Sequence, residues 1–228
     1  MFFPERITQI AENDRVLEIG PGGLPHPRSD VFLELEYSDA SMEEMQRGFA
    51  KKPEYTKPVY YYDGKVFPFS DKEFDYVICS HVLEHVDDLE SFISELFRVS
   101  SKGYIEYPTM YYEYLYNFSV HTNLLKFHVG NLLYIKKLDT HLEEFTPVQS
   151  LFSHSLNQEY FSLVNSLKDY MFEGFEWSSP FTVRRSTTLN DLTWETIKIP
   201  KYLPITARVE KKRGILNKLT QFIRTRLA

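Results

Sequence analysis

A short apolar run that ends in a loop of glycine and proline constrains the fold of this chain most. Val16, Leu17 and Ile19 form the run, and Gly20-Pro-Gly-Gly23 follows directly. Glycine tolerates positive φ and lets a ligand approach the main chain closely. We therefore predict a buried strand over residues 15–20 and a ligand-facing loop after it. A plain turn is the alternative, because one glycine loop is a weak nucleotide signal.

Glu18 interrupts this apolar run. A carboxylate inside a buried strand costs free energy unless a donor pairs with it. A ribose hydroxyl or an amino group of a bound cofactor is such a donor, so we expect Glu18 to contact a cofactor.

Further apolar runs alternate with helical patterns along the first half of the chain. The clearest helix covers residues 87–98, where Asp87 is the expected N-cap and Glu90 completes a capping box. This alternation predicts an α/β fold with a parallel sheet, in which ligands bind beyond the carboxyl ends of the strands. The predicted strands are residues 31–35, 59–62, 74–79 and 104–107, and the other predicted helices are residues 4–12 and 41–49.

The second half is rich in aromatic residues and histidine. We interpret residues 109–156 as an insertion or lid on the same domain, which covers residues 1–200. A helix is expected over 158–170 from its apolar period. Residues 171–177 and 181–185 are expected to pair as an antiparallel hairpin around Ser178-Ser-Pro180.

Charge is distributed unevenly between the body and the tail. Residues 201–228 carry a net charge of +7 and residues 1–200 carry −13. The acidic body argues against nucleic-acid binding. Residues 211–228 form a basic amphipathic pattern, which predicts either peripheral contact with an anionic membrane or docking on the body or on a second subunit of a homodimer.

The single cysteine, Cys79, excludes an internal disulfide and favours a reducing compartment. The first six residues lack the form of a signal peptide, and no apolar run is long enough to span a bilayer. We expect a cytoplasmic protein, with the tail at the inner face of the membrane if it binds lipid.

The order of these motifs resembles a known family. Residues 16–22 are similar to the first motif of class I S-adenosylmethionine-dependent methyltransferases, and residues 67–88 to the fourth-strand motif of the type-11 members. Residues 95–108 continue the likeness, which covers residues 12–110. The resemblance implies a Rossmann-like, mostly parallel sheet of the seven-stranded methyltransferase type, with helices on both faces and a helical, aromatic lid.

The resemblance also implies S-adenosylmethionine as cofactor, with S-adenosylhomocysteine as product. A carboxylate at the end of the second strand can accept from both ribose hydroxyls, and Glu34 is our choice, with Glu36 as the alternative. Asp63 is expected to accept from the adenine amino group. The predicted cofactor-binding residues are Glu18, Gly20, Pro21, Gly22, Gly23, Glu34, Asp63, Gly64, Ser80, His81 and His85.

Methyl transfer from a sulfonium is an in-line displacement in which the protein mainly aligns the partners. A hydroxyl acceptor benefits from a general base, for which we predict His81 or His121. Tyr107 and Tyr111 are predicted to bind the acceptor, because tyrosines stack on sugar rings; packing of the lid is the alternative for this tyrosine-rich stretch. No histidine and cysteine cluster has metal-ligand spacing, so no metal is predicted.

We therefore predict a methyltransferase acting on oxygen of a sugar, a glycan precursor or another small metabolite. A non-catalytic cofactor-binding scaffold or regulatory domain is one alternative. A nicotinamide-dependent oxidoreductase is disfavoured, because Pro25 stands where its glycine motif needs the third glycine. No Asn-Pro-Pro-Tyr follows the fourth strand, which lowers the expectation of a nitrogen acceptor. The proline-rich loop of residues 23–30 replaces the helix that usually follows the first motif and resembles a bacterial subgroup that does not specify the acceptor.

Overall fold

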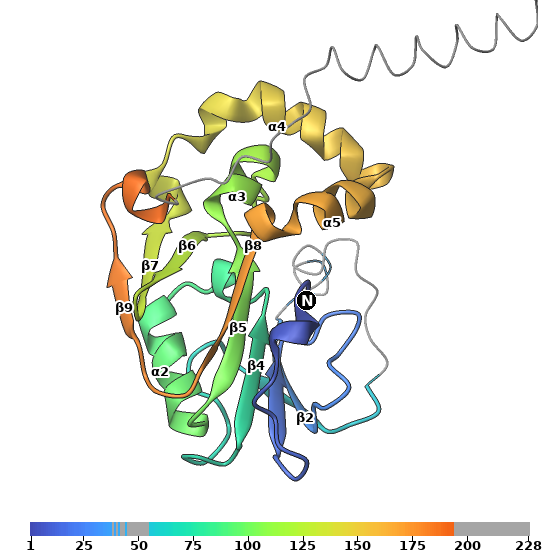
Figure 1. Ribbon diagram of the computed structural model, residues 1–228, viewed down its shortest axis with the longest axis vertical. Coiled ribbons are helices and arrows are strands. Elements are labelled where there is room, and N and C mark those ends of the chain that lie inside the picture. The colour runs from blue at the N-terminus through green and yellow to red at the C-terminus, as the bar shows by residue number, and fades with distance from the viewer. Residues whose placement is uncertain (38, 40, 42–43, 45–54, 194–228) are drawn as a thin grey trace, which may run out of the picture. The chain divides into compact units, whose positions relative to one another are not determined.

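Apolar runs of the sequence form the strands of a six-stranded sheet. The computed structural model describes residues 1–37, 39, 41, 44 and 55–193. Within them the sheet has the order β3-β2-β1-β4-β5-β8, and its first five strands are parallel (Figure 1). Its strands are β1 (Val16–Ile19), β2 (Val31–Leu35), β3 (Val59–Tyr62), β4 (Tyr76–Ser80), β5 (Gly103–Pro108) and β8 (Phe172–Trp177). This confirms the predicted α/β fold with a mostly parallel sheet, here with six strands.

The predicted hairpin of residues 171–177 and 181–185 is wrong. β8 pairs antiparallel with β5, from Gly103 opposite Trp177 to Pro108 opposite Phe172. This pairing satisfies the backbone groups of β5 that would otherwise lie on an open sheet edge. β9 (Thr182–Arg185) instead pairs parallel with β7 (Asn131–Lys136), which forms a hairpin with β6 (Asn123–His128). These three strands make a second sheet in the order β6-β7-β9.

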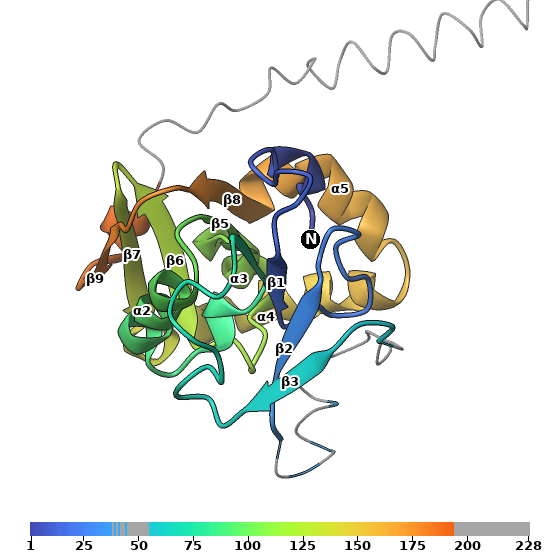
Figure 2. The ribbon, with the colours of Figure 1, turned by 90° about the horizontal axis from the view of Figure 1, so that it is seen from below.

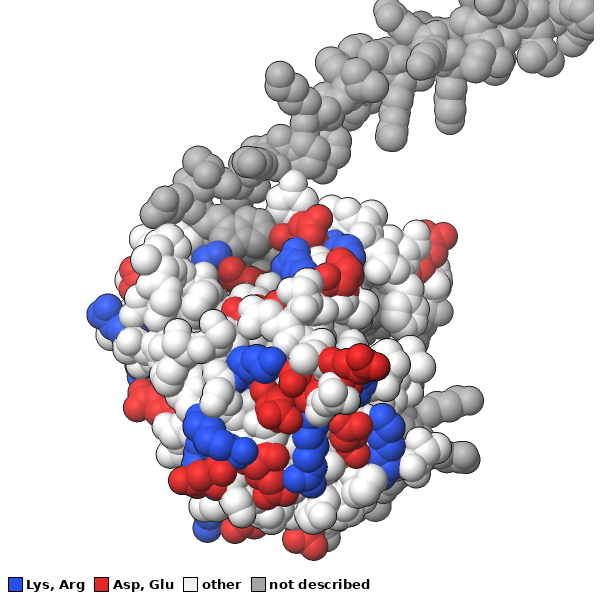
Figure 3. All heavy atoms as spheres, turned by 60° about the horizontal axis from the view of Figure 1, so that its bottom comes forward, with Lys and Arg blue, Asp and Glu red and all other residues white. Residues whose placement is uncertain are grey.

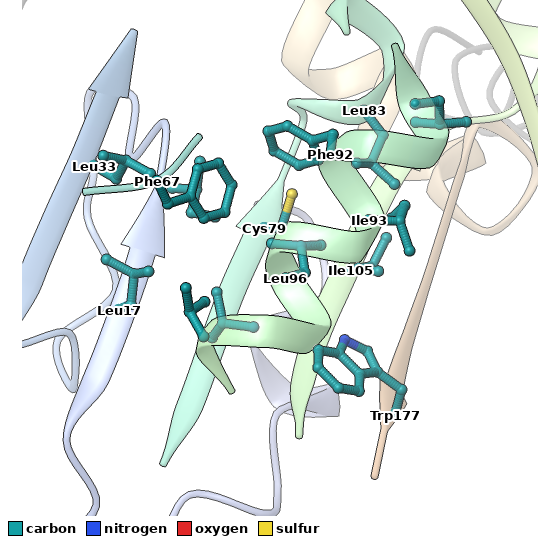
Figure 4. Packing of buried hydrophobic residues seen from close by; sticks show 14 of the residues in the cluster. Leu17, Leu33, Phe67, Cys79, Leu83, Phe92, Ile93, Leu96, Ile105 and Trp177 are labelled. Carbon is teal, nitrogen blue, oxygen red and sulfur yellow. The ribbon is translucent and has the colours of Figure 1, made fainter. Parts of the chain in front are cut away.

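Helix α2 (Leu89–Val99) covers one face of the large sheet. Its buried Phe92, Ile93 and Leu96 point at strand side chains such as Cys79 and Ile105 (Figure 4). The N-cap lies one residue later than predicted, because the carboxylate of Asp88, and not that of Asp87, accepts a hydrogen bond from the backbone N–H of Ser91. Glu90 does not complete a capping box; it accepts a hydrogen bond from the Tyr134 hydroxyl.

The N-terminal segment lies on the opposite side of the large sheet from α2 (Figure 2). Ile7 and Ile10 pack there against a buried cluster that includes Val16, Tyr76 and Tyr104. The only helical turn of this segment is η1 (Pro4–Arg6), so the helix predicted over residues 4–12 is wrong beyond its first turn. Irregular backbone replaces the helix, and the carboxylate of Glu176 accepts hydrogen bonds from the backbone N–H groups of Thr8 and Gln9.

Residues 109–171 follow β5 in the chain, and their helical parts lie beyond its carboxyl end (Figure 1). They form α3 (Met110–Tyr116), the β6–β7 hairpin, η3 (Lys137–Asp139), η4 (Leu142–Phe145), α4 (Thr146–Ser153), η5 (His154–Asn157) and α5 (Tyr160–Met171). A short 3-10 helix, η6 (Leu189–Leu192), follows β9. The region predicted as a lid therefore contains a strand pair as well as helices.

Basic and acidic side chains are interspersed over the face shown in Figure 3. No helix within the described ranges has the length and apolar character needed to cross a membrane. The helix predicted over 41–49 falls almost entirely outside the described residues, and the tail of residues 201–228 lies wholly outside them.

Candidate functional site

The order of the strands creates a switch point at the carboxyl edge of the sheet. From β1 the chain builds β2 and β3 on one side, then crosses to β4 and β5 on the other. Ligands of open α/β sheets bind where the order reverses in this way. The loop after β1 and the segment after β4 meet at this point, since Gly20 lies against Val82. The predicted cofactor residues therefore gather at one edge of the sheet.

Two glycines of the first loop have positive φ for different reasons. Gly20 has φ +57°, and a Cβ built on it would lie 2.9 Å from Val82 Cγ2. Gly22 has φ +58°, but a Cβ on it would meet no atom of the described residues within 4 Å, its two chain neighbours aside. Pro21 between them is buried, and Gly23 after them is exposed. Gly20 is thus required by the protein's own packing, whereas Gly22 leaves open space over the loop.

Glu18 is buried in β1, where its Oε2 accepts hydrogen bonds from His26 N at 2.8 Å and from Ser29 Oγ at 2.6 Å. Burial raises the pKa of this carboxyl group. The donors come from the proline-rich loop that replaces the usual helix. Glu18 therefore anchors that loop, and its contact with a cofactor stays a prediction.

Glu34 is buried near the end of β2, where the hydroxyl of Tyr55 donates a hydrogen bond to its Oε1. Glu36, the alternative ribose ligand, is exposed. Asp63 is exposed as well and accepts a hydrogen bond from Lys65 N at 3.0 Å, beside Gly64 with φ +85°. The contact of Asp63 with an adenine amino group stays a prediction.

His81 lies between two buried carboxylates after β4. Its Nδ1 is 3.2 Å from Glu84 Oε1 and its Nε2 is 3.0 Å from Glu106 Oε1. Burial lowers the pKa of His81, but these two carboxylates raise it by more, so the net shift is upward. Burial also raises the pKa of Glu106, but His81, the Tyr104 hydroxyl and the N-terminal amino group together lower it by more, to about 2. Both ring nitrogens of His81 are therefore engaged by carboxylates.

Glu106 on β5 was not foreseen as part of this site. Its carboxylate accepts from Phe2 N at 2.6 Å, from Phe3 N at 3.0 Å and from the Tyr104 hydroxyl at 2.7 Å. Ser80 Oγ, on a predicted cofactor residue, donates to its Oε1 at 3.2 Å. A sequence signal was present, since Glu106 interrupts a buried strand just as Glu18 does.

The second predicted base, His121, lies in a different cluster. Its ring is 4.7 Å from that of His85, and its Nδ1 is 2.5 Å from Glu113 Oε1. One potential ligand atom from each of Glu84, His85 and His121 lies within 4.8 Å of the others. Burial lowers the pKa of His85. This cluster was not predicted from the sequence, although His81-Val-Leu-Glu-His85 has a spacing found in some zinc enzymes.

The two tyrosines predicted to bind the acceptor differ in exposure. Tyr107 has no exposed surface, packs in the core on the α2 side and donates its hydroxyl to Glu173 Oε2 at 2.8 Å. Contact between Tyr107 and an acceptor would require the core to open. Tyr111 is half-buried on α3 and remains the better candidate of the two.

A family model described as a methyltransferase domain matches residues 17–105, which run from β1 into β5. The match confirms the resemblance predicted from the motifs, and with it S-adenosylmethionine as the cofactor of this domain. The nicotinamide alternative loses its support. No protein of curated function matches the chain.

Several solved structures are similar to the chain at low identity. The YcgJ protein from Bacillus subtilis is 19% identical, with a TM-score of 0.32, over 44% of this chain and 47% of its own. An S-adenosylmethionine-dependent methyltransferase from Mesorhizobium loti is 14% identical, with a TM-score of 0.35, over 57% of this chain and 61% of its own. The [4+2]-cyclase SpnF is 13% identical, with a TM-score of 0.41, over 78% and 79%. Likenesses this weak carry no inference about function, and the chain spans about half the length of the first of these relatives.

Proposed function

We propose that this protein transfers the methyl group of S-adenosylmethionine to a hydroxyl oxygen of a sugar or another small metabolite, because residues 17–105 match a family model described as a methyltransferase domain. The observation that carries the proposal is the open space over Gly22 at the switch point of the sheet. Bound S-adenosylmethionine supplies an activated methyl group, so the protein has to align the acceptor and take up its proton.

The residues present fit this cofactor. The loop of residues 20–23 can hold its amino acid end through backbone groups, and Glu34 lies at the end of β2, where ribose hydroxyls are bound in folds of this kind. Asp63, after β3, has carboxylate oxygens for the adenine amino group. The three sets come from the ends of β1, β2 and β3 on the same edge of the sheet, which supports one extended nucleoside ligand across them.

Two contacts support a choice between the two predicted bases for the acceptor's proton. His81 has both ring nitrogens engaged by carboxylates, so neither nitrogen is open to an acceptor hydroxyl. His121 has its Nδ1 paired with Glu113, which orients the ring as in a carboxylate–histidine pair. The Glu84, His85 and His121 cluster is therefore the better candidate for activating a hydroxyl.

Calorimetry with S-adenosylhomocysteine tests the cofactor part of this proposal. Replacing Glu34 removes a carboxylate that accepts from the ribose, so Glu34→Ala is expected to weaken binding about 10- to 100-fold. Glu36→Ala is the matched control, because Glu36 is exposed and two residues away. Wild-type protein that binds neither S-adenosylmethionine nor S-adenosylhomocysteine would refute the proposal.

A screen for methyl uptake tests the acceptor. Nucleotide sugars, lipid-linked glycans and small hydroxylated metabolites are incubated with labelled cofactor and the protein. Transfer to oxygen in any of these classes supports the proposal, and transfer to nitrogen alone contradicts it. Tight cofactor binding without turnover on any acceptor would instead favour the non-catalytic scaffold.

A further inference from the structure

Three potential metal ligands meet directly after β4. Glu84 and His85 come from the 3-10 turn η2 (Leu83–His85), and His121 comes from the loop before β6. One potential ligand atom of each lies within 4.8 Å of those of the other two. We infer that this cluster is a binding site for a divalent transition-metal ion and that its donors suit Zn²⁺ best.

Glu84 supplies an independent reason to place a cation here. Its side chain is 1% exposed, and only its Oε1 has a partner, at His81 Nδ1. Its Oε2 is buried without a hydrogen-bond partner among the described residues. Buried carboxylate oxygens are normally paired, because an unpaired one loses its hydration without compensation. A metal ion bound at Oε2 would provide the missing positive partner.

Both histidines are already oriented as metal ligands are. His85 Nδ1 is 3.1 Å from the carbonyl oxygen of Val120, which can only accept, so Nδ1 carries the proton and Nε2 keeps its lone pair. His121 Nδ1 faces the carboxylate of Glu113, which is itself held by Lys137 Nζ at 2.9 Å. Metal-binding histidines characteristically donate their second N–H to a carbonyl or a carboxylate.

The donor types select the class of metal. Two imidazoles and one carboxylate suit zinc and its neighbours, whereas Mg²⁺ and Ca²⁺ prefer sites built from oxygen alone. Three protein ligands leave a coordination position open, as in catalytic zinc sites. Zinc bonds of about 2.1 Å require ligand atoms about 3.4 Å apart, so the three side chains would draw together on binding. An occupied site would use His121 Nε2 and so make this residue a ligand and not the general base.

Zinc titration of the full chain tests the inference without any cofactor or acceptor. The protein is stripped with a chelator, and Zn²⁺ binding is followed by competition with a chromophoric chelator. The wild type is expected to bind one Zn²⁺ per chain, and the double variant His85→Ala/His121→Ala none. His128→Ala/His141→Ala is the matched control, because it also removes two histidines but from exposed positions, and it is expected to bind like the wild type.

Two further measurements keep the test decisive if the double variant does not fold. Glu113→Gln removes the carboxylate behind His121 and is expected to weaken Zn²⁺ binding about 10- to 100-fold. In NMR spectra of the histidine side chains of the wild type, Zn²⁺ is expected to shift the signals of His85 and His121 and to leave those of His128 unchanged. Absence of tight binding by the wild type, an unaltered affinity in the double variant, or unshifted His85 and His121 signals would each overturn the inference. Because these readouts need no methyl donor, they can fail while cofactor binding succeeds, and the reverse.

Discussion

Alanine at Gly20 is expected to destabilise the protein more than alanine at Gly22, although both glycines have nearly the same positive φ. A side chain in this conformation costs roughly 1–2 kcal/mol at either position. At Gly20 the new methyl group would also lie 2.9 Å from Val82 Cγ2, which a Cβ does not tolerate without movement. Overpacking of this kind typically costs about 1–3 kcal/mol. We therefore expect Gly20→Ala to lose about 2–5 kcal/mol of unfolding free energy, and Gly22→Ala about 1–2 kcal/mol.

Urea unfolding followed by circular dichroism measures this difference. The overlap is isolated by repeating Gly20→Ala in a Val82→Ala background, where its cost should fall towards that of Gly22→Ala. The reasoning would be refuted by equal losses in the two single variants, or by a Gly20→Ala cost that Val82→Ala leaves unchanged. Gly22→Ala also has a second readout. Apart from its chain neighbours, no described residue has an atom within 4 Å of the new methyl group, so a fall in affinity for S-adenosylhomocysteine would report the ligand itself.

Three further outcomes follow from the packing around α2. The bidentate contact with Arg98 lowers the pKa of Glu95 below 4.5, so the stability it contributes is complete above that pH and is lost as the pH falls through the lowered pKa. Glu95→Gln should therefore be less stable than the wild type at pH 7, and melting curves should show the gap closing in acid; a gap that is constant with pH would contradict this. Leu96 is fully buried, and Leu96→Ala should cost about 2–5 kcal/mol in urea unfolding, with a smaller loss showing that the site collapses around the cavity. Asp88→Ala should lower the melting temperature while Asp87→Ala should not, because Asp88 is the N-cap of α2, and equal melting temperatures would reject that assignment.

The strands of the parallel sheet could be predicted because each is a short apolar run with clear ends. Residues 31–35 and 59–62 are strands with the predicted bounds. β2 is buried along most of its length, so its apolar composition alone marks it, whereas β3 is an edge strand with exposed Tyr60 and Tyr61 and is marked by its β-branched and aromatic residues. The helix after β4 was equally clear from its apolar period, and its N-cap was misplaced by one residue because two adjacent aspartates compete for the cap position.

The partners of the last strands could not be predicted from the sequence. Residues 172–177 and 182–185 are separated by a short Ser-Ser-Pro segment that is typical of a hairpin, yet the two strands join different sheets. The choice depends on tertiary contacts. Phe175 stacks on Phe127 of the β6–β7 hairpin at a centroid distance of 3.8 Å, and Gly174 lets the Tyr104 side chain lie against β8. The sequence pattern alone does not indicate which sheet edge lacks a partner strand.

The candidate site was predictable where order along the chain determines position. Glu34, Asp63 and His81 follow successive parallel strands, so topology alone brings them to one edge. The cluster of Glu84, His85 and His121 was not, because His121 is 36 residues after His85 and belongs to a region whose fold the sequence left open. No spacing rule connects two such segments; only the docking of the loop before β6 on η2 does, through hydrogen bonds such as that from Thr122 N to Glu84 O at 2.6 Å.

Buried carboxylates are the feature for which sequence reasoning and structure diverge most usefully. A glutamate in an apolar strand suggests that a ligand supplies its hydrogen-bond donor. In this protein the chain itself supplies the donors, Ser29 for Glu18 and His81 for Glu106. Hydrogen bonds within the chain therefore offset the desolvation free energy of both carboxylates. The offset is incomplete at Glu84, where one oxygen has no donor among the described residues and two imidazoles lie beside it. Glu84, and not Glu18, is therefore the buried carboxylate that indicates a cation. A positive charge there would pair with the oxygen that has no donor among the described residues.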